Sequence, residues 1–344
     1  MLMKNQRNKL LFILILVIIS SFVVFGCSDN NQPATQNQSE EKKQEPKIDY
    51  PKGNIQTIVS YSAGGGTDTT ARIVASFLEK ELGKSVIVVN KPGAKGELGM
   101  TETANGKPDG YNLGFISYPD NVLMSSYKET TYDNSKLKYI ASFTQSPTVL
   151  LIKKDSPYST IEEFISYAKE NPGKISVAVG GDGHVYSVMQ LEKAAEIELQ
   201  TVMFSSGSKA MNAAVGGHTD AAFVAIQFGL ASQEQGCKVI GSAGNERTNN
   251  LADVPTFIEK GYDVQAEMMR ILATPVGTPD EIVNILKEAC DQVSKSQEYI
   301  DKLGNTGEIV KYQSGPQLEE FLKKSDAKIK EVVGENKDMF LRGA

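Results

Sequence analysis

Three consecutive glycines followed by a threonine and an aspartate are the residues of this sequence best suited to hold an anion. Gly64–Gly66 follow a β-branched run at residues 55–60, and apolar residues at helical spacing begin at Ala71. Thr67 or Asp68 can cap the first turn of that helix. A helix that starts after a glycine turn presents unpaired backbone N–H groups at its positive end, which favours an anion. The alternative is a tight turn that binds nothing. The Gly-Lys-Ser/Thr and Gly-x-Gly-x-x-Gly patterns of nucleotide-binding loops are missing here.

A second stretch has the same design. A strand at residues 175–179 is followed by Gly180–Gly183 and His184, and then by a helical pattern that runs to Ala195. If the two stretches belong to different domains, their helix N-termini can face each other across a cleft. Ligands of α/β proteins bind beside the carboxyl ends of strands, where such turns gather.

The chain lacks the residue patterns of catalysis and metal binding. Its two histidines, His184 and His218, form no His-x-His or His-x-x-x-His pair, and no Gly-x-Ser-x-Gly occurs. We therefore expect no catalytic residues, no metal and no cofactor. Cys237 and Cys290 lie far apart in sequence, and two buried free thiols are expected rather than a disulfide.

The N-terminus is typical of an exported lipoprotein. A basic segment precedes an apolar run at residues 10–25, and Cys27 follows Gly26 in a sequence that resembles a bacterial lipobox. We predict a signal peptide at residues 1–26, lipid attachment at Cys27 and a disordered tether at residues 27–47, which are rich in Asn, Gln, Ser, Glu and Lys. A retained transmembrane anchor is the alternative, but the apolar run is short for a membrane span.

The net charge of the folded body, which we expect at about residues 48–344, argues against nucleic acid and anionic membranes as partners. Removing the leader removes three basic residues and no acidic one, which lowers the formal charge from −6 to −9. An acidic body disfavours nucleic acid and anionic membrane surfaces as partners. It gives an anionic ligand no long-range attraction, so an anion site must depend on local donors.

The body alternates strand and helix patterns, which predicts α/β layers with largely parallel sheets. The strands expected from the sequence are 55–60, 86–89, 113–117, 148–153, 175–179, 221–225 and 239–242, and the helices are 71–82, 98–105, 159–173, the run ending at 195, 277–293 and 314–333. A capping box at Ser159 or Thr160 with Glu162 or Glu163 is expected to start the helix at 159–173, and Pro279 and Asp280 to lie in the first turn of the helix at 277–293.

From about residue 55 to the C-terminus, the order of motifs resembles the extracytoplasmic solute receptors of tripartite tricarboxylate transporters, the Bug family. Each motif is weak by itself, but their order is specific. The matching motifs are Gly64–Asp68 with Ala71-Arg72, Leu82-Gly83, Val86–Val89, Asn90–Gly96, Pro108–Tyr111, Ala168–Lys174, Val254–Phe257 and Pro275–Pro279.

The resemblance implies a two-lobed periplasmic-binding-protein fold of type II, a Venus flytrap, with a cleft between the lobes. Lobe 1 is expected at residues 48–147 and 268–344, and lobe 2 at 148–267. Backbone N–H groups of the first motif should hold one ligand carboxylate, with the second lobe at the far end. The implied ligand-binding residues are Ala63, Gly65, Gly66, Thr67, Asp68, Thr148, Gly181, Asp182, Gly183, His184, Ser205, Ser206 and Gly207.

The resemblance also implies the function. We expect a monomeric, lipid-anchored receptor outside the cytoplasm that delivers a small carboxylate, a di- or tricarboxylate such as citrate, to a membrane permease. Two alternatives stay open, a receptor that serves a sensor kinase and an enzyme with an anion-lined cleft. If the His184 ring donates to the ligand as an imidazolium, affinity should rise as pH falls from about 8 to about 6.

Overall fold

We describe the protein from a computed structural model, which covers residues 48–334 and 336–341. The signal peptide, Cys27 and the tether expected from the sequence lie outside these described residues. The strands are β1 (Ile55–Val59), β2 (Val86–Asn90), β3 (Asn112–Tyr118), β4 (Leu137–Ile152), β5 (Ser176–Val179), β6 (Gln200–Met203), β7 (Ala221–Ala225), β8 (Lys238–Ser242), β9 (Glu267–Pro275) and β10 (Val310–Ser314).

Every helix expected from the sequence is present, and the structure contains several further helices that the sequence did not predict. Thr160 caps α4 by accepting a hydrogen bond from the Glu163 N–H, and the Glu163 carboxylate accepts one from the Ser159 N–H, as expected of a capping box. Pro279 is the N-cap of α8, one position before the first turn in which it was expected. The α-helices are α1 (Gly66–Leu82), α2 (Glu97–Ala104), α3 (Asp120–Tyr127), α4 (Ile161–Glu170), α5 (Asp182–Ala195), α6 (Gly207–Val215), α7 (Ile226–Gln233), α8 (Asp280–Lys295), α9 (Gln297–Gly304), α10 (Gly315–Gly334) and α11 (Lys337–Leu341).

The sheet is mixed, so the expectation of largely parallel sheets was wrong. Strands run in the order β2-β1-β3-β9-β4-β7-β5-β6, with β8 and β10 also paired to β4. The pairs that β1 and β5 form with their neighbours are parallel, whereas every pair that involves β4 or β9 is antiparallel. The reason is the chain path: β4 carries the chain from one group of strands to the other, and β9 returns beside it in the opposite direction.

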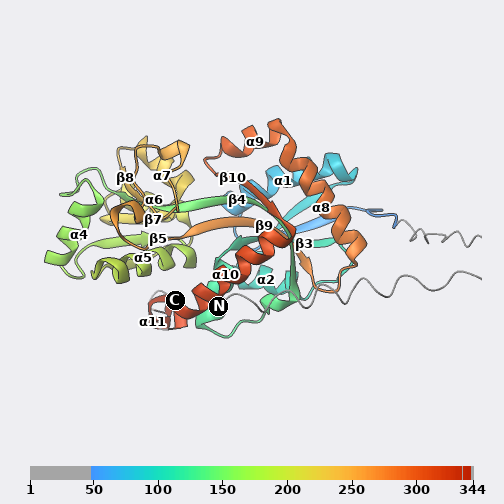
Figure 1. Cartoon of the computed structure of the whole chain (residues 1–344), viewed down its shortest axis with the longest axis horizontal. Coiled ribbons are helices and arrows are strands. Elements are labelled where there is room, and N and C mark those ends of the chain that lie inside the picture. Colours follow the sequence, from blue (N-terminus) through green and yellow to red (C-terminus); the bar gives the residue numbers. More distant parts are fainter. Residues whose placement is uncertain (1–47, 335, 342–344) are drawn as a thin grey trace, which may run out of the picture. The chain divides into compact units, whose positions relative to one another are not determined.

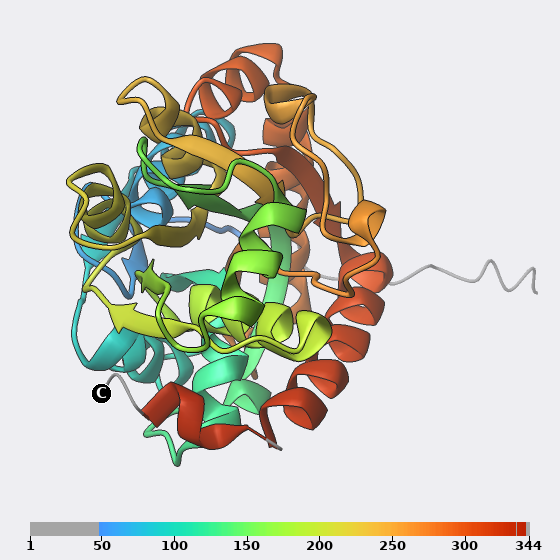
Figure 2. The same cartoon turned by 90° about the vertical axis from the view of Figure 1, so that its left-hand side faces the viewer.

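These two groups of strands define what we call the lobes. Lobe 1 holds β1, β2, β3 and β10 with the part of β4 that pairs with β9 as far as Pro147, and lobe 2 holds β5 to β8 with the part of β4 from Thr148 onward. Figure 1 shows β4 and β9 running between α1, α2, α8 and α9 at one end of the body and α4 to α7 at the other. Helix α10 packs along α3, and α11 contacts both α3 and α5; Figure 2 shows α10 on one side of the body.

The core consists of apolar side chains from both faces of the sheet. Cys237 and Cys290 are free and buried, as expected from the sequence, and burial raises the pKa of both thiols. Across residues 48–334 and 336–341, no helix is long and apolar enough to cross a membrane. The same residues contain no cluster of three or more His, Cys, Asp or Glu side chains that could hold a metal ion.

Candidate functional site

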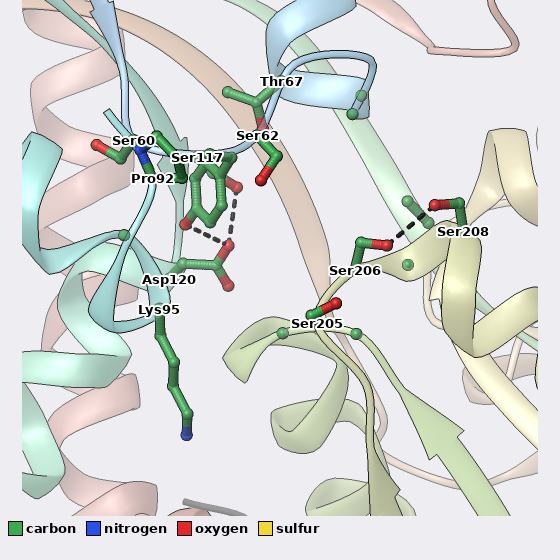
Figure 3. A pocket seen from close by; sticks show the side chains of 18 of the residues that line it. Ser60, Ser62, Thr67, Pro92, Lys95, Ser117, Asp120, Ser205, Ser206 and Ser208 are labelled. Atoms are coloured by element: carbon green, nitrogen blue, oxygen red, sulfur yellow. Dashed lines mark hydrogen bonds between the residues drawn. The ribbon is translucent and has the colours of Figure 1, made fainter. Parts of the chain in front are cut away.

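A cleft of about 800 Å³ lies where the turns after β1, β5 and β6 meet, so both lobes line it. Figure 3 shows this space, with Ser62 and Thr67 on the lobe 1 side and Ser205 and Ser206 on the lobe 2 side. The residues that line it are Ser60–Thr67, Pro92, Gly93, Lys95, Gly96, Ser117, Asp120, Gly180–Asp182, His184, Met203–Lys209, Ala225, Phe228, Met268 and Arg270.

The first glycine turn leaves the N-terminus of α1 open to the cleft. The helix begins at Gly66, its N-cap is Gly65, and no side chain caps it, so the expected capping by Thr67 or Asp68 was wrong. The first N–H with a helical acceptor is that of Thr69, which donates to the Gly65 carbonyl at 2.9 Å. The N–H groups of Gly66 and Thr67 and the Thr67 hydroxyl donate to no described residue. These three donors border the cleft and suit a carboxylate.

Asp68 lies behind this turn and does not line the cleft. Its carboxylate accepts hydrogen bonds from the Gly64 N–H at 2.9 Å, from Arg72 and from Asn90. Burial alone would raise the pKa of Asp68, but these three donors together outweigh burial and lower it. The ionised side chain therefore holds the shape of the glycine turn, and the expected direct role of Asp68 in ligand contact has no support in this geometry.

The second glycine turn brings two backbone segments of lobe 2 into close contact. A Cβ atom on Gly180 would lie 2.2 Å from the backbone nitrogen of Gly207, so only glycine fits there. A Cβ atom on the neighbouring Gly181 would meet nothing within 4 Å. The tight packing at Gly180 fixes the start of α5 beside the start of α6, and both face the cleft.

His184 lies in this cleft with one ring nitrogen unused. Its side chain is 5 % exposed, and Nδ1 accepts a hydrogen bond from the Gly180 N–H at 3.3 Å. In the neutral ring the proton therefore resides on Nε2, which is buried and has no partner among the described residues. Burial lowers the pKa of His184 to about 4; the nearby Asp120 carboxylate opposes this shift and Arg270 adds to it. At neutral pH the ring is an uncharged donor without an acceptor among the described residues.

The N-terminus of α5 is already engaged by one carboxylate of the protein, that of Asp120. The Gly183 N–H donates to Asp120 Oδ1 at 2.8 Å, and the His184 N–H donates to the Gly181 carbonyl at 3.1 Å. Asp182 pairs with Lys95 Nζ at 3.3 Å and accepts a hydrogen bond from the Tyr127 hydroxyl at 2.7 Å. Gly183 therefore faces Asp120 and does not line the cleft.

Loop residues 205–207 form the remaining wall in lobe 2. Ser206 is the N-cap of α6 and accepts a hydrogen bond from the Lys209 N–H at 3.3 Å. Its hydroxyl also lies 3.0 Å from that of Ser208, as the dashed line in Figure 3 marks. Ser205 is exposed at the cleft edge. The Ser205 and Ser206 hydroxyls are thus neutral hydrogen-bonding groups of lobe 2 that can rotate toward a ligand.

Arg270 on β9 is a charged cleft residue that the sequence did not reveal. Its side chain is 4 % exposed, Nη1 donates to the Ser117 hydroxyl at 2.7 Å, and Nη2 pairs with Glu308 at 3.4 Å. The Ser146 hydroxyl also donates to Glu308 at 2.5 Å. The Nε atom of Arg270 is buried without a partner among the described residues.

The cleft brings together ten of the thirteen residues expected to bind ligand. The exceptions are Asp68 and Gly183, described above, and Thr148, which is fully buried with its hydroxyl 2.8 Å from that of Ser187. The residues that sequence reasoning missed include Lys95, Asp120 and Arg270. Asp120 could have been found, because it lies two residues after the end of β3, a strand whose carboxyl end faces the cleft.

Comparisons with known proteins agree with this fold. Residues 70–337 match the family described as "Tripartite tricarboxylate transporter family receptor". The chain is 28 % identical over 286 residues to the "UPF0065 protein in gbd 5'region" of Cupriavidus necator, covering 83 % of this chain and 88 % of that protein. It is 26 % identical over 268 residues to protein BugT of Bordetella pertussis, covering 75 % and 81 % of the two chains. Among solved structures, MatC of Rhodopseudomonas palustris with bound malate is 27 % identical to this chain. The match covers 83 % of this chain and 100 % of MatC, with a TM-score of 0.74.

The fold and the cleft define a solute-binding receptor with the two-lobed periplasmic-binding-protein fold, as the sequence predicted. The family match covers most of the chain and extends over parts of both lobes. The chain belongs to the receptor family of the tripartite tricarboxylate transporters.

Proposed function

We propose that this receptor captures a small carboxylate in the cleft between its lobes, with citrate and malate as the first candidates. One ligand carboxylate would accept hydrogen bonds from the N–H groups of Gly66 and Thr67 and from the Thr67 hydroxyl. The observation that carries the proposal is that these donors border the cleft without partners among the described residues. The bound malate of MatC, a similar protein, supports a carboxylate of this size.

The far end of the ligand would contact lobe 2 at His184 and at residues 205–207. The His184 Nε2–H is the strongest donor candidate there, because it is buried and has no partner among residues 48–334 and 336–341. A ligand oxygen that accepts this proton would satisfy a polar group that is otherwise buried at a cost in free energy. We also propose residues 48–147 with 268–344 and residues 148–267 as the two bodies that close on the ligand, since β4 exchanges its partner strands between Pro147 and Thr148.

We further propose that the receptor acts outside the cytoplasm, held to the membrane by a lipid on Cys27, and that it delivers its ligand as a monomer to a membrane permease. The lipobox-like sequence and the polar segment after it support the anchor. We propose no catalytic role, and a turnover screen with the carboxylates that bind is the direct test of that part.

The experiment that tests the function is calorimetric titration of the body with citrate and malate. Thr67→Val removes a hydroxyl donor to the carboxylate and should weaken binding by about 1.5–3 kcal/mol, which is the range for a hydrogen bond to a charged group. Thr69→Val is the matched control, because Thr69 is in the same helix turn but does not line the cleft. The absence of heat with every carboxylate tried, or equal affinities for the two variants, would contradict the proposal.

The structure also improves the choice of glycine variant. A side chain at Gly66 would begin 2.5 Å from the Gln227 amide nitrogen, so Gly66→Val would disturb the protein as well as the ligand. A Cβ atom on Gly65 would meet only the Ser62 carbonyl oxygen, at 3.4 Å. Gly65→Ala should therefore leave the fold intact and report on how closely the ligand approaches this turn.

A further inference from the structure

The Asp120 carboxylate lies in the cleft and connects the two lobes. It is at the start of α3 in lobe 1 and is 7 % exposed. Its Oδ2 accepts hydrogen bonds from the Tyr61 hydroxyl at 3.0 Å and the Ser117 hydroxyl at 2.9 Å, and its Oδ1 accepts one from the Gly183 N–H of lobe 2 at 2.8 Å. Figure 3 shows the first two bonds and the carboxylate between the lobe 1 turn and Ser205.

This placement restricts what a ligand can present to lobe 2. Asp120 occupies the start of α5, which is the position that a second ligand carboxylate would take if both helix N-termini bound anions. Two carboxylates at one site repel each other, so an anionic ligand group must lie elsewhere. Residues 205–207 and the His184 Nε2–H offer that other position.

Asp120 also has hydrogen-bonding capacity left. An ionised carboxylate has about four lone-pair sites, and the described residues fill three of those on Asp120. Because the residue lines the cleft, the remaining site is available to a ligand that carries a donor. A ligand with an acceptor or a methylene group at this point would leave a buried charge incompletely solvated.

A second feature places the ligand near Asp120. His184 Nε2 and Arg270 Nε are buried polar atoms of cleft residues, and neither has a partner among the described residues. The Ser117 hydroxyl donates to Asp120 and accepts a hydrogen bond from Arg270, and His184 directly follows Gly183, whose N–H donates to Asp120, so the three groups lie close together. A ligand carrying both an acceptor for the unpaired donors and a donor for Asp120 would satisfy all three.

We propose that Asp120 selects, among small carboxylates, those that carry a hydroxyl or ammonium group beside the carboxylate. This inference rests on the proposed function and deepens it, because it names the group that the cleft requires in addition to an anion. The backbone donors of α1 bind any carboxylate, whereas the Asp120 carboxylate distinguishes one carboxylate from another.

The test compares ligands that differ only in the donor, at pH 7.5, by calorimetric titration. Malate against succinate tests the hydroxyl, and aspartate against succinate tests the ammonium. The wild-type protein should bind malate or aspartate about 10- to 150-fold more tightly than succinate, as expected for a hydrogen bond to a charged group. This comparison needs no variant, so it decides the matter even if a substitution at Asp120 fails to fold.

Asp120→Asn should reduce the preference to within about threefold, because the charge that strengthens the bond is lost. Asp326→Asn is the matched control, since Asp326 is a partly buried carboxylate that accepts a hydrogen bond from the Tyr118 hydroxyl and does not line the cleft. It should keep the full preference. Equal binding of all three ligands to the wild-type protein, or an unchanged preference in Asp120→Asn, would overturn this inference and leave the proposed function standing. No binding of any carboxylate would overturn both.

Discussion

Replacing His184 with alanine tests whether an uncharged imidazole holds the far end of the ligand. The ring is 5 % exposed, and its Nδ1 is engaged by the Gly180 N–H, so the neutral form can donate only through Nε2. With a pKa of about 4, the ring is uncharged throughout the range from pH 8 to pH 6. From the sequence alone we expected affinity to rise over this range through an imidazolium. The structure changes this expectation: affinity should be independent of pH between pH 8 and pH 6.

The size of the effect follows from the bond that is lost. A hydrogen bond to a charged acceptor contributes about 1.5–3 kcal/mol, so His184→Ala should weaken binding by roughly 10- to 150-fold at pH 7.5. His184→Gln, which keeps an amide donor, should recover part of this loss. If the bound carboxylate raises the pKa of His184, affinity will rise only as pH falls toward that raised value, because the complex then binds more protons than the free protein.

The same pKa predicts a change in stability with pH. The pKa of His184 is lower in the folded protein, about 4, than the ordinary value of 6.5, so the unfolded chain takes up the proton first as pH falls. The folded state keeps its full stability above about pH 6.5 and loses about 3 kcal/mol from this group by pH 4, at 1.36 kcal/mol per pKa unit. The part of the pH dependence due to His184 should be absent in His184→Ala.

Two measurements check this reasoning. Calorimetric titration with malate between pH 6 and pH 8 should give affinities constant within about twofold for the wild-type protein, and urea unfolding at pH 7.5 and pH 5 should show a smaller difference for His184→Ala than for wild type. A wild-type affinity that rises toward pH 6, with a flat profile in the variant, would show that imidazolium is the donor. Equal affinities of the two proteins at pH 7.5 would show that His184 does not contact the ligand.

Three further predictions concern the anchor and the walls of the cleft. The full-length protein should partition into detergent, and Cys27→Ala should abolish labelling with a lipid precursor; labelling that persists would place the lipid elsewhere. Gly180→Ala should destabilise the fold by more than about 2 kcal/mol in urea unfolding, because its Cβ atom would overlap the backbone at Gly207, whereas Gly181→Ala should change stability by less than about 0.5 kcal/mol. Glu308→Gln should destabilise the protein by about 3 kcal/mol by leaving Arg270 as a buried charge without its counterion; a loss below about 1 kcal/mol would show that the pair is dispensable.

The regular elements with clear boundaries were predictable from the sequence. Strand β7 matches its expected range, and α1 ends at Leu82 with Gly83 in the left-handed conformation, where the sequence placed the stop. Strand β9 was missed because nearly all of its residues are buried, so the sequence shows neither alternation nor helical spacing. Strand β4 was recognised only at its C-terminal end for the same reason, and the antiparallel centre of the sheet was missed along with it.

The candidate site was predictable where it depends on glycine and not where it depends on tertiary contacts. Glycine runs beside a strand and a helix are visible in the sequence, and they located the turns at Gly65 and Gly181 correctly at the cleft. The roles of Asp68 and Asp120 were not visible, because an aspartate near a helix start can cap, hold a turn or face a ligand. Only the positions of Gly64 and Gly183 in space separate these roles.

On the proposed function, this division between backbone and side chains would let one fold serve many ligands. In the proposed function, backbone N–H groups at the start of α1 would recognise the charge that all carboxylates share, so they would determine the class of ligand and not distinguish its members. Side chains on other elements of the same lobe can change without altering the first glycine turn: Asp120 and Arg270 come from β3–α3 and β9, and neither belongs to the glycine turns. Because both are buried and charged, each ligand group beside them must match them in hydrogen bonding, and a mismatch leaves a charge incompletely solvated. The choice among carboxylates is therefore expected to depend on these few buried side chains, and substitutions there should change the preferred ligand before they abolish binding of carboxylates as a class.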